Sequence, residues 1–217
     1  MITAYYIQKN IETIDEDMLV KMLPALPDER REKAMRYKIH EGKVLCALSW
    51  LLLEHLIKKE DIHHGPFTIT TGKYEKPYVR DDSFFFNISH TSGAVLAAAG
   101  FSPLGADIQK IMEKDYGPVA KRFLKPKEYS LITRSPEPQK EFARLWTLKE
   151  SYTKYTGEGI SALENVPDLS SFGKAGGRLS NGPSFLTEEG DGLFISICSN
   201  DAMKIMEIGL DEVLNHL

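Results

Sequence analysis

Two long helical patterns, about one hundred residues apart, constrain the fold of this chain more than any other feature. Leucines recur at helical spacing between about residues 41 and 59, and a second long helix is predicted at about residues 139–155. Short apolar segments typical of strands follow each helix, and residues 93–99 and 192–198 occupy similar places in the two parts. A chain that repeats one outline in this way is expected to fold as two similar α/β halves.

The remaining segments complete this outline. In the first part we expect a charged helix that begins at Pro27 and Asp28 and strands at residues 2–8, 67–71 and 84–88, and a further strand is expected at residues 104–109. In the second part we expect a charged segment at residues 121–129, a helix end at Gly157 and Gly159, a loop or mobile hairpin at residues 170–182, and strands at residues 193–198 and 204–209. The predicted fold class is α/β (α+β), with an N-terminal half at residues 1–103 and a C-terminal half at residues 104–217.

Composition narrows the functional classes. The chain has 217 residues, 42% of them hydrophobic, which is enough for a substantial core. Its net charge of -4 disfavours a nucleic-acid partner. Cys46 and Cys198 lie in separate apolar runs and are expected to be buried thiols of a reducing compartment. The N-terminus does not resemble a signal peptide, and the apolar run at residues 44–53 is too short to span a membrane, so we expect a cytoplasmic protein without a membrane partner.

An acidic strand supplies the first candidate site residues. Side chains alternate across a strand, so Leu104, Ala106 and Ile108 are expected to face the core. Asp107 and Gln109 then share the other face, where two oxygen donors could hold one Mg²⁺ together with a phosphate. The alternative is that Asp107 is an ordinary solvent-facing residue at a strand end.

The second long helix carries charges that need an explanation. Glu150 and Lys154 are neighbours on the face opposite the apolar stripe, and Trp146 also lies off that stripe. We therefore expect this helix to be covered on more than one side, where charged groups need partners such as a metal and a polyphosphate. The alternative is a surface ion pair, which contributes only about 0.2–0.5 kcal/mol.

The first half adds a histidine and several basic residues. The three phenylalanines at residues 84–86 predict a buried strand that delivers Asn87, Ser89 and His90 to a rim. As an imidazolium, His90 would donate to a phosphate oxygen and offset its charge; the alternative is a turn histidine with a local hydrogen bond. Arg30 and Lys33 follow near-helical spacing on the charged helix, as part of a phosphate clamp or of a solvated face.

Together these segments resemble the 4′-phosphopantetheinyl transferases of the surfactin-synthetase-activating (Sfp) type. The family patterns are Phe-Asn-Ile-Ser-His, Gly-x-Asp-x-Glu, and Trp-[Thr/Ser]-x-Lys-Glu-x-x-x-Lys followed by Gly-x-Gly. They match residues 86–90, 105–109 and 146–154, with Gly157 and Gly159 after the last. The helix start at Pro27 and the turn at residues 74–77 are also similar, and the likeness is clear over about residues 1–160.

The resemblance implies a fold and an activity. The fold is a pseudo-dimer of two similar α/β halves with coenzyme A bound in the cleft between them. The activity is the Mg²⁺-dependent transfer of the 4′-phosphopantetheine arm from coenzyme A to a serine of an acyl or peptidyl carrier protein, which releases adenosine 3′,5′-bisphosphate. The nucleophile therefore belongs to the carrier protein. We expect a monomer, because the two fused halves cover each other's cleft-forming surfaces.

The resemblance also implies roles for individual residues. The metal ligands would be Asp107, Gln109 and Glu150. Glu150, directly or through a metal-bound water, would take the serine proton, and Lys154 would stabilise the leaving phosphate. His90 and Lys149 would bind phosphate oxygens. The 3′-phosphate would be held by Arg30, Lys33 and Lys43, and the adenosine end would be lined by Tyr74, Lys76, Pro77 and Ser89.

Two features leave alternatives open. The family's acidic block ends in glutamate, whereas this chain has Gln109, so we expect a weaker metal site. A coenzyme A-binding module without transfer activity and a Mg²⁺-dependent nucleotide pyrophosphatase remain as other functions. The segment at residues 121–125 combines charge with apolar side chains and would steer an acidic carrier protein, or it is an ordinary amphipathic helix.

Overall fold

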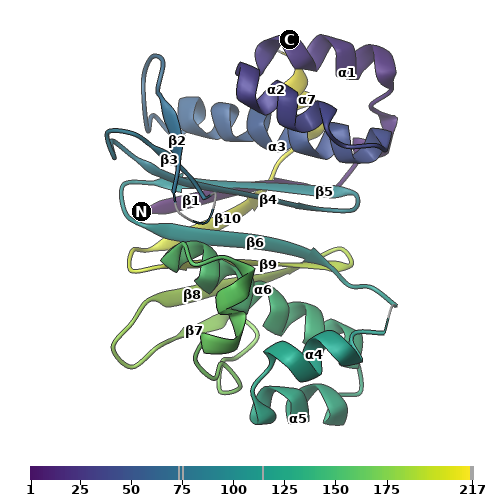
Figure 1. Ribbon diagram of the computed structural model, residues 1–217, viewed down its shortest axis with the longest axis vertical. Helices are drawn as coiled ribbons and strands as arrows, with labels where there is room; N and C mark the ends of the chain where they lie inside the picture. Colours follow the sequence, from purple (N-terminus) through teal and green to yellow (C-terminus); the bar gives the residue numbers. More distant parts are fainter. Residues whose placement is uncertain (73, 75, 114, 216–217) are drawn as a thin grey trace.

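The protein is built in four layers, with two β-sheets face to face and helices on the outer face of each sheet (Figure 1). The computed structural model describes residues 1–72, 74, 76–113 and 115–215. The core between the sheets takes alternate side chains from both of them, such as Ala4, Leu96, Ala106 and Ile195. This arrangement confirms the predicted fold class of two similar halves, each with its own sheet and its own helices.

The first half folds as the sequence pattern predicts. Its sheet contains β1 (Ile2–Ile7), β5 (Ala94–Gly100) and β4 (Phe85–Thr91) in antiparallel order. The outer face is covered by α1 (Glu16–Met22), α2 (Asp28–Met35) and the long α3 (His40–Lys59), whose Leu48, Leu52 and Leu56 are fully buried. A hairpin of β2 (Ile69–Thr71) and β3 (Pro77–Val79) lies beside α3, and two 3-10 turns occupy Ile11–Thr13 and Leu23–Ala25.

The second half repeats this plan. Its sheet has the order β6 (Leu104–Lys110), β9 (Leu193–Ser199), β8 (Ser184–Gly190) and β7 (Gly176–Arg178). Its helices are α4 (Gly117–Phe123), α5 (Pro126–Arg134) and α6 (Pro138–Thr156), followed by a 3-10 turn at Ile160–Asn165. The charged segment predicted at residues 121–129 is thus two helices, because the chain becomes extended at Leu124 and Pro126 begins a new helix.

Corresponding strands begin in the same way in the two halves. β5 follows Gly93 and β9 follows Gly192, and both glycines have a positive φ, 73° and 69° respectively. Each of these strands then pairs antiparallel with the first strand of its own half, β5 with β1 and β9 with β6. The two segments that the sequence pattern placed in similar positions are therefore structurally equivalent.

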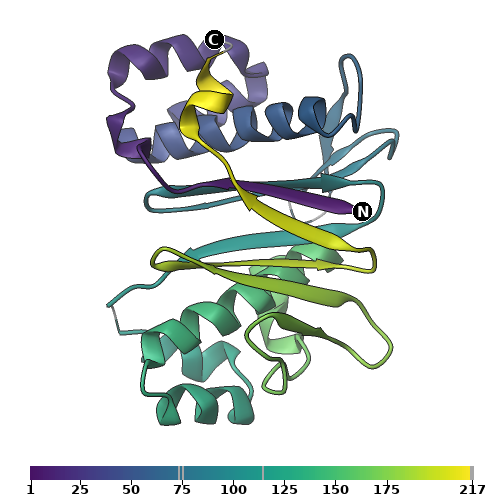
Figure 2. The same cartoon turned by 180° about the vertical axis from the view of Figure 1, so that it is seen from behind.

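The end of the chain returns to the first sheet. β10 (Met203–Glu207) pairs in parallel with β1, and α7 (Leu210–Leu214) packs near α3 (Figure 2). Strand β10 was expected from its sequence pattern, but its partner was not, because periodicity does not identify the strand that pairs. The division into residues 1–103 and 104–217 remains a prediction, and β10 and α7 belong to the first sheet and its helical layer.

Side chains join the two sheets at their edges. β4 and β6 are edge strands of different sheets, and Asn87 on β4 accepts a hydrogen bond from the backbone N–H of Ala106 at 3.0 Å. Thr91 accepts from the backbone N–H of Lys110 at 3.4 Å. Asn87 and Thr91 are four residues apart on one face of β4, so Ser89, midway between them on the same face, also lies against β6.

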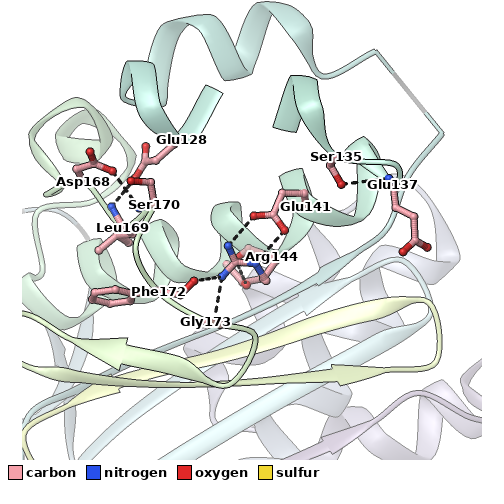
Figure 3. Close-up of polar contacts among 11 residues, drawn as sticks. Glu128, Ser135, Glu137, Glu141, Arg144, Asp168, Leu169, Ser170, Phe172 and Gly173 are labelled. Atoms are coloured by element: carbon pink, nitrogen blue, oxygen red, sulfur yellow. Dashed lines mark hydrogen bonds and ion pairs between the residues drawn. The ribbon is translucent and has the colours of Figure 1, made fainter. Parts of the chain in front are cut away.

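A separate polar group, which Figure 3 shows, holds the N-terminal part of α6. Arg144 pairs with Glu141 at 2.6 Å and donates to the carbonyl oxygens of Phe172 and Gly173 at 3.3 and 3.2 Å. Glu128 on α5 accepts a hydrogen bond from the backbone N–H of Leu169 at 2.9 Å. These bonds fix the chain after α6 against α5 and α6. None of the helices within the described ranges is both long and apolar enough to cross a membrane.

Candidate active site

Asp107 is the centre of a polar cluster between the two halves. Its side chain is 5% exposed, and its Oδ1 accepts hydrogen bonds from Ser89 Oγ at 2.7 Å and from Lys154 Nζ at 2.6 Å. Lys154 Nζ also lies 2.9 Å from Ser89 Oγ. The cluster therefore joins β4, β6 and α6, and Asp107 is not the solvent-facing strand-end residue of the alternative interpretation.

A glycine brings β6 and α6 close enough for this cluster to form. A Cβ at Gly105 would overlap the carbonyl oxygen of Ser151 and the backbone nitrogen of Tyr155. Gly105 and Asp107 face α6, whereas Leu104, Ala106 and Ile108 face the core between the sheets, as the alternation of the strand predicts.

Glu150 is the second carboxylate of the cluster. Burial, followed by the charge of Asp107, raises the pKa of Glu150 to about 7, against the opposing effect of Lys154. Lys154 pairs with Asp107 across two elements, which differs from the surface ion pair with Glu150 that helix spacing alone suggests. Two carboxylates and a lysine thus share one partly enclosed site.

Basic groups of both halves surround His90. Burial lowers the pKa of His90, and the charges of Lys154, Lys33 and Arg30 lower it further, while Asp107 acts in the opposite direction. This shift favours the neutral imidazole over the imidazolium that the sequence suggested. His90 lies within β4 rather than at a rim beyond the strand, and its ring meets Tyr37 edge-on at 6.2 Å.

The three residues expected to hold a 3′-phosphate lie on α2 and α3, which pack against each other. Arg30 is 9% exposed, with its guanidinium 5.1 Å from the ring of Trp50, and it lines a cavity of about 700 Å³. Lys33 lines a neighbouring cavity of about 470 Å³. The charges of Arg30 and Lys33 both lower the pKa of the Cys46 thiol, against the larger effect of its burial. Lys43 lies half-buried in the first turn of α3, three residues before this cysteine.

The expectation for Lys149 is corrected by the structure. Its side chain is fully buried, and its ammonium lies 3.1 Å from the carboxylate of Glu128, which is also fully buried. Burial lowers the pKa of Lys149, and the charge of Glu128 opposes part of this shift. Lys149 therefore fixes α6 to α5 inside the second half and does not contact a ligand at Asp107.

Two residues expected at the adenosine end have different contacts. Ser89 is directed at Asp107 and Lys154. Lys76 donates to two backbone carbonyls of the second half, those of Leu104 at 3.2 Å and of Lys154. Pro77 lines the cavity of about 700 Å³ beside Arg30, and Tyr74 is 48% exposed.

Gln109 lies at the end of the cluster nearer to solvent. Its amide nitrogen donates to the carbonyl oxygen of Lys110 at 3.0 Å, and the residue lines a cavity of about 260 Å³ with Met112 and Trp146. Over the described ranges, no group of three or more His, Cys, Asp or Glu side chains has an arrangement that could hold a metal. Two carboxylates remain, and this donor set fits Mg²⁺, which takes one or two protein carboxylates together with phosphate and water.

The segment expected to meet a carrier protein is partly internal. Phe123 and Leu124 pack into the core of the second half, and Lys125 donates to the carbonyl oxygen of Glu164 at 2.6 Å. Arg122 lies 3.6 Å from the carboxylate of the same glutamate. Lys121 and Arg122 are exposed, and steering of a carrier protein by this segment stays a prediction.

Two residues with a part in this arrangement were not expected from the sequence: Tyr37 covers His90, and Glu128 neutralises Lys149 inside the second half. Asn87 was expected at a rim, but its contact with β6 was not. Glu128 had a detectable signal, because a lysine in an apolar helix requires a buried acid elsewhere. The contacts of Tyr37 and Asn87 depend on tertiary packing, which local patterns do not encode.

Comparisons with known proteins agree with this geometry. Residues 103–199 match the family model of the 4′-phosphopantetheinyl transferase superfamily. A 4′-phosphopantetheinyl transferase of Bacillus subtilis is 31% identical over 164 residues, which cover 74% of this chain and 71% of the relative. The 4′-phosphopantetheinyl transferase Sfp of Bacillus subtilis (strain 168) is 31% identical over 65% of this chain and 64% of its own length. The 4′-phosphopantetheinyl transferase HetI of a Nostoc species is 38% identical over 90 residues, 40% of this chain and 38% of its own. The chain belongs to the 4′-phosphopantetheinyl transferase superfamily and is an enzyme of the transferase class.

Proposed function

We propose that the protein transfers the 4′-phosphopantetheine arm of coenzyme A to a serine of an acyl or peptidyl carrier protein, in a Mg²⁺-dependent reaction. The observation that carries this proposal is the cluster of Asp107, Glu150 and Lys154. His90 lies next to this cluster, and the charges of Lys33 and Arg30 lower its pKa. Carboxylates suited to a metal and cations suited to phosphates meet there from both halves. This combination favours a ligand with several phosphates.

Asp107 and Glu150 are the proposed metal ligands, with the amide oxygen of Gln109 as a third, directly or through water. Mg²⁺ bound there would offset the negative charge of the pyrophosphate and of the transition state. Ser89 supports this role indirectly, because its hydroxyl fixes the Asp107 carboxylate. Lys154, which neutralises Asp107 in the free protein, would turn toward the phosphates once they bind.

Glu150 is the proposed general base. Its pKa of about 7 is raised by burial and by Asp107, so its carboxylate accepts a proton readily near neutral pH. The serine hydroxyl of the carrier protein would lose its proton to Glu150 as its oxygen forms a bond to the phosphorus that carries the pantetheine arm. The bond from that phosphorus to the bridging pyrophosphate oxygen breaks, and adenosine 3′,5′-bisphosphate leaves with the electron pair.

The remaining basic residues are proposed to hold coenzyme A. His90 and Lys154 would donate to the pyrophosphate oxygens, and Arg30, Lys33 and Lys43 to the 3′-phosphate. Pro77, with Tyr74, would line the adenosine end beside Arg30. Binding both substrates in one orientation contributes as much to such a reaction as any single group.

A mass measurement on a carrier protein tests this proposal. The protein is incubated with coenzyme A, Mg²⁺ and an apo carrier protein, and the carrier is then weighed, with EDTA in place of Mg²⁺ as a control. A gain of one phosphopantetheinyl group that requires Mg²⁺ supports the proposal. Hydrolysed coenzyme A with an unchanged carrier indicates a nucleotide pyrophosphatase, and no product indicates a binding module; either result contradicts transfer.

We further propose that the enzyme acts as a monomer in the cytoplasm. Cys46 and Cys198 are both buried and unpaired, which suits a reducing compartment. The two sheets cover each other within one chain, so each half already has its partner. Light scattering of the purified protein tests whether it is a monomer. A dimer mass at micromolar concentration would contradict the proposal.

A further inference from the structure

Lys76, in the first half, makes contacts with the second half that a role in ligand binding would not require. It lies in the loop between β2 and β3 of the first half. Its ammonium donates to the carbonyl oxygen of Leu104, where β6 begins, at 3.2 Å, and to the carbonyl oxygen of Lys154 near the end of α6. We call these two contacts the Lys76 bridge.

The bridge contacts the C-terminal end of α6, where a positive charge stabilises a helix. The last carbonyls of a helix have no partner within the helix, and the negative end of the helix dipole lies there. α6 ends at Gly157, whose N–H and that of Glu158 both return to the carbonyl oxygen of Thr153, at 2.9 and 3.2 Å. The carbonyl of Lys154 is thus left for Lys76, whose Cδ passes 3.7 Å from the Cβ position of Gly157.

The same bridge spans the two elements that carry the carboxylates. Asp107 lies three residues after Leu104 on β6, and Glu150 lies one turn before Lys154 on α6. An ammonium held between Leu104 and Lys154 therefore fixes the distance between the strand of one carboxylate and the helix of the other. We propose that Lys76 is a positioning residue. It caps α6 from the first half and so holds Glu150 and Lys154 on this helix at a fixed distance from Asp107 on β6. This inference rests on the proposed transfer function and assigns Lys76 to geometry rather than to nucleotide binding.

The energetics of the bridge favour positioning over stability. Within the part of the chain that the structure describes, the acceptors of this ammonium are neutral carbonyls rather than a carboxylate. Burial, aided by the charge of Lys154, lowers the pKa of Lys76 to about 8, so the buried charge opposes folding. Replacement of such a charge by an apolar side chain of similar size is often neutral for stability. Lys76 therefore adds little to the stability of the fold. Because it contacts both β6 and α6, we expect its loss to lower kcat.

Lys76→Met tests the inference, with the exposed Lys21→Met on α1 as the control. We expect the melting temperature of Lys76→Met to stay within about 3 °C of wild type, while kcat falls between about tenfold and a hundredfold. The KM for coenzyme A should change less than kcat does. Hydrogen exchange of the Gly157 and Glu158 amides should become faster in Lys76→Met and stay unchanged in Lys21→Met.

Each other outcome is decisive. A rise in KM that exceeds the fall in kcat would make Lys76 a nucleotide-binding residue and overturn the inference, as would unchanged kinetics or unchanged exchange. If Lys76→Met does not fold, Lys76→Gln is measured in the same way, because its amide keeps N–H donors without the charge. If the wild type transfers nothing from coenzyme A, the proposed function fails instead, and the exchange measurement alone decides whether the bridge exists.

Discussion

At the scale of single residues, the site depends on how charges are matched. Asp107 pairs with Lys154 within the second half, and Ser89 of the first half donates to the same carboxylate oxygen across the seam. No ion pair of Glu150 is found among the described residues, and burial, followed by the charge of Asp107, raises its pKa to about 7. The sequence predicted the presence of Asp107, Glu150, Lys154 and His90 in one site. It placed Lys149 there incorrectly, because helix spacing does not show that a lysine is paired with Glu128 inside the protein.

The raised pKa of Glu150 predicts a pH-dependent stability of the metal-free protein. The folded state binds this proton more tightly than the unfolded chain, whose ordinary value is 4.5, so the stabilisation is present below pH 4.5 and is lost as the pH rises through 7. In EDTA, Glu150→Gln should therefore be more stable than wild type by about 1–3 kcal/mol at pH 8, and by less at pH 5. Urea unfolding at both pH values measures the difference. The exposed Glu158→Gln serves as the control, and an equal effect of Glu150→Gln at both pH values would contradict the account.

At the scale of secondary structure, the close approach of β6 and α6 creates the site. Both elements were predicted at nearly their observed bounds, because alternation and helical spacing are strong in these segments. Their contact was not predicted, since it depends on the missing side chain of Gly105. The predicted helix end at Gly157 is confirmed, with φ at 77°, a conformation that glycine adopts easily. Strand β8 and helices α1 and α7 were missed, because short elements leave little periodic signal.

Gly105→Ala tests the importance of this contact. An added Cβ meets backbone atoms of Ser151 and Tyr155, which cannot move as a side chain could, so the strand and the helix must separate. We expect a loss of at least about 1–3 kcal/mol in the free energy of unfolding and a large loss of transfer activity. Gly209→Ala is the matched control, because the nearest atom to its Cβ position is a side-chain oxygen of Glu212 at 3.9 Å. Urea midpoints of the two variants give the comparison, and equal midpoints would count against the account.

At the scale of the whole molecule, the proposed site takes residues from two halves that meet at one seam. The first half contributes Arg30, Lys33 and His90, and the second half contributes both carboxylates. The repeated outline of the sequence predicted the two halves, but not the return of β10 to the first sheet. Pairing between strands two hundred residues apart, such as Ile2 with Met203, leaves no local pattern in the sequence.

The central claim is that Asp107 and Glu150 of the second half form, at this seam, a metal site for the phosphates of coenzyme A. Calorimetric titration of coenzyme A into the wild-type protein, with Mg²⁺ and with EDTA, tests it most directly. We predict that Mg²⁺ tightens binding at least about tenfold, or 1.4 kcal/mol. Glu150→Gln should lose this gain while its affinity in EDTA stays unchanged, and the control Glu158→Gln should keep it. The same Mg²⁺-dependent gain in Glu150→Gln as in wild type would contradict the account.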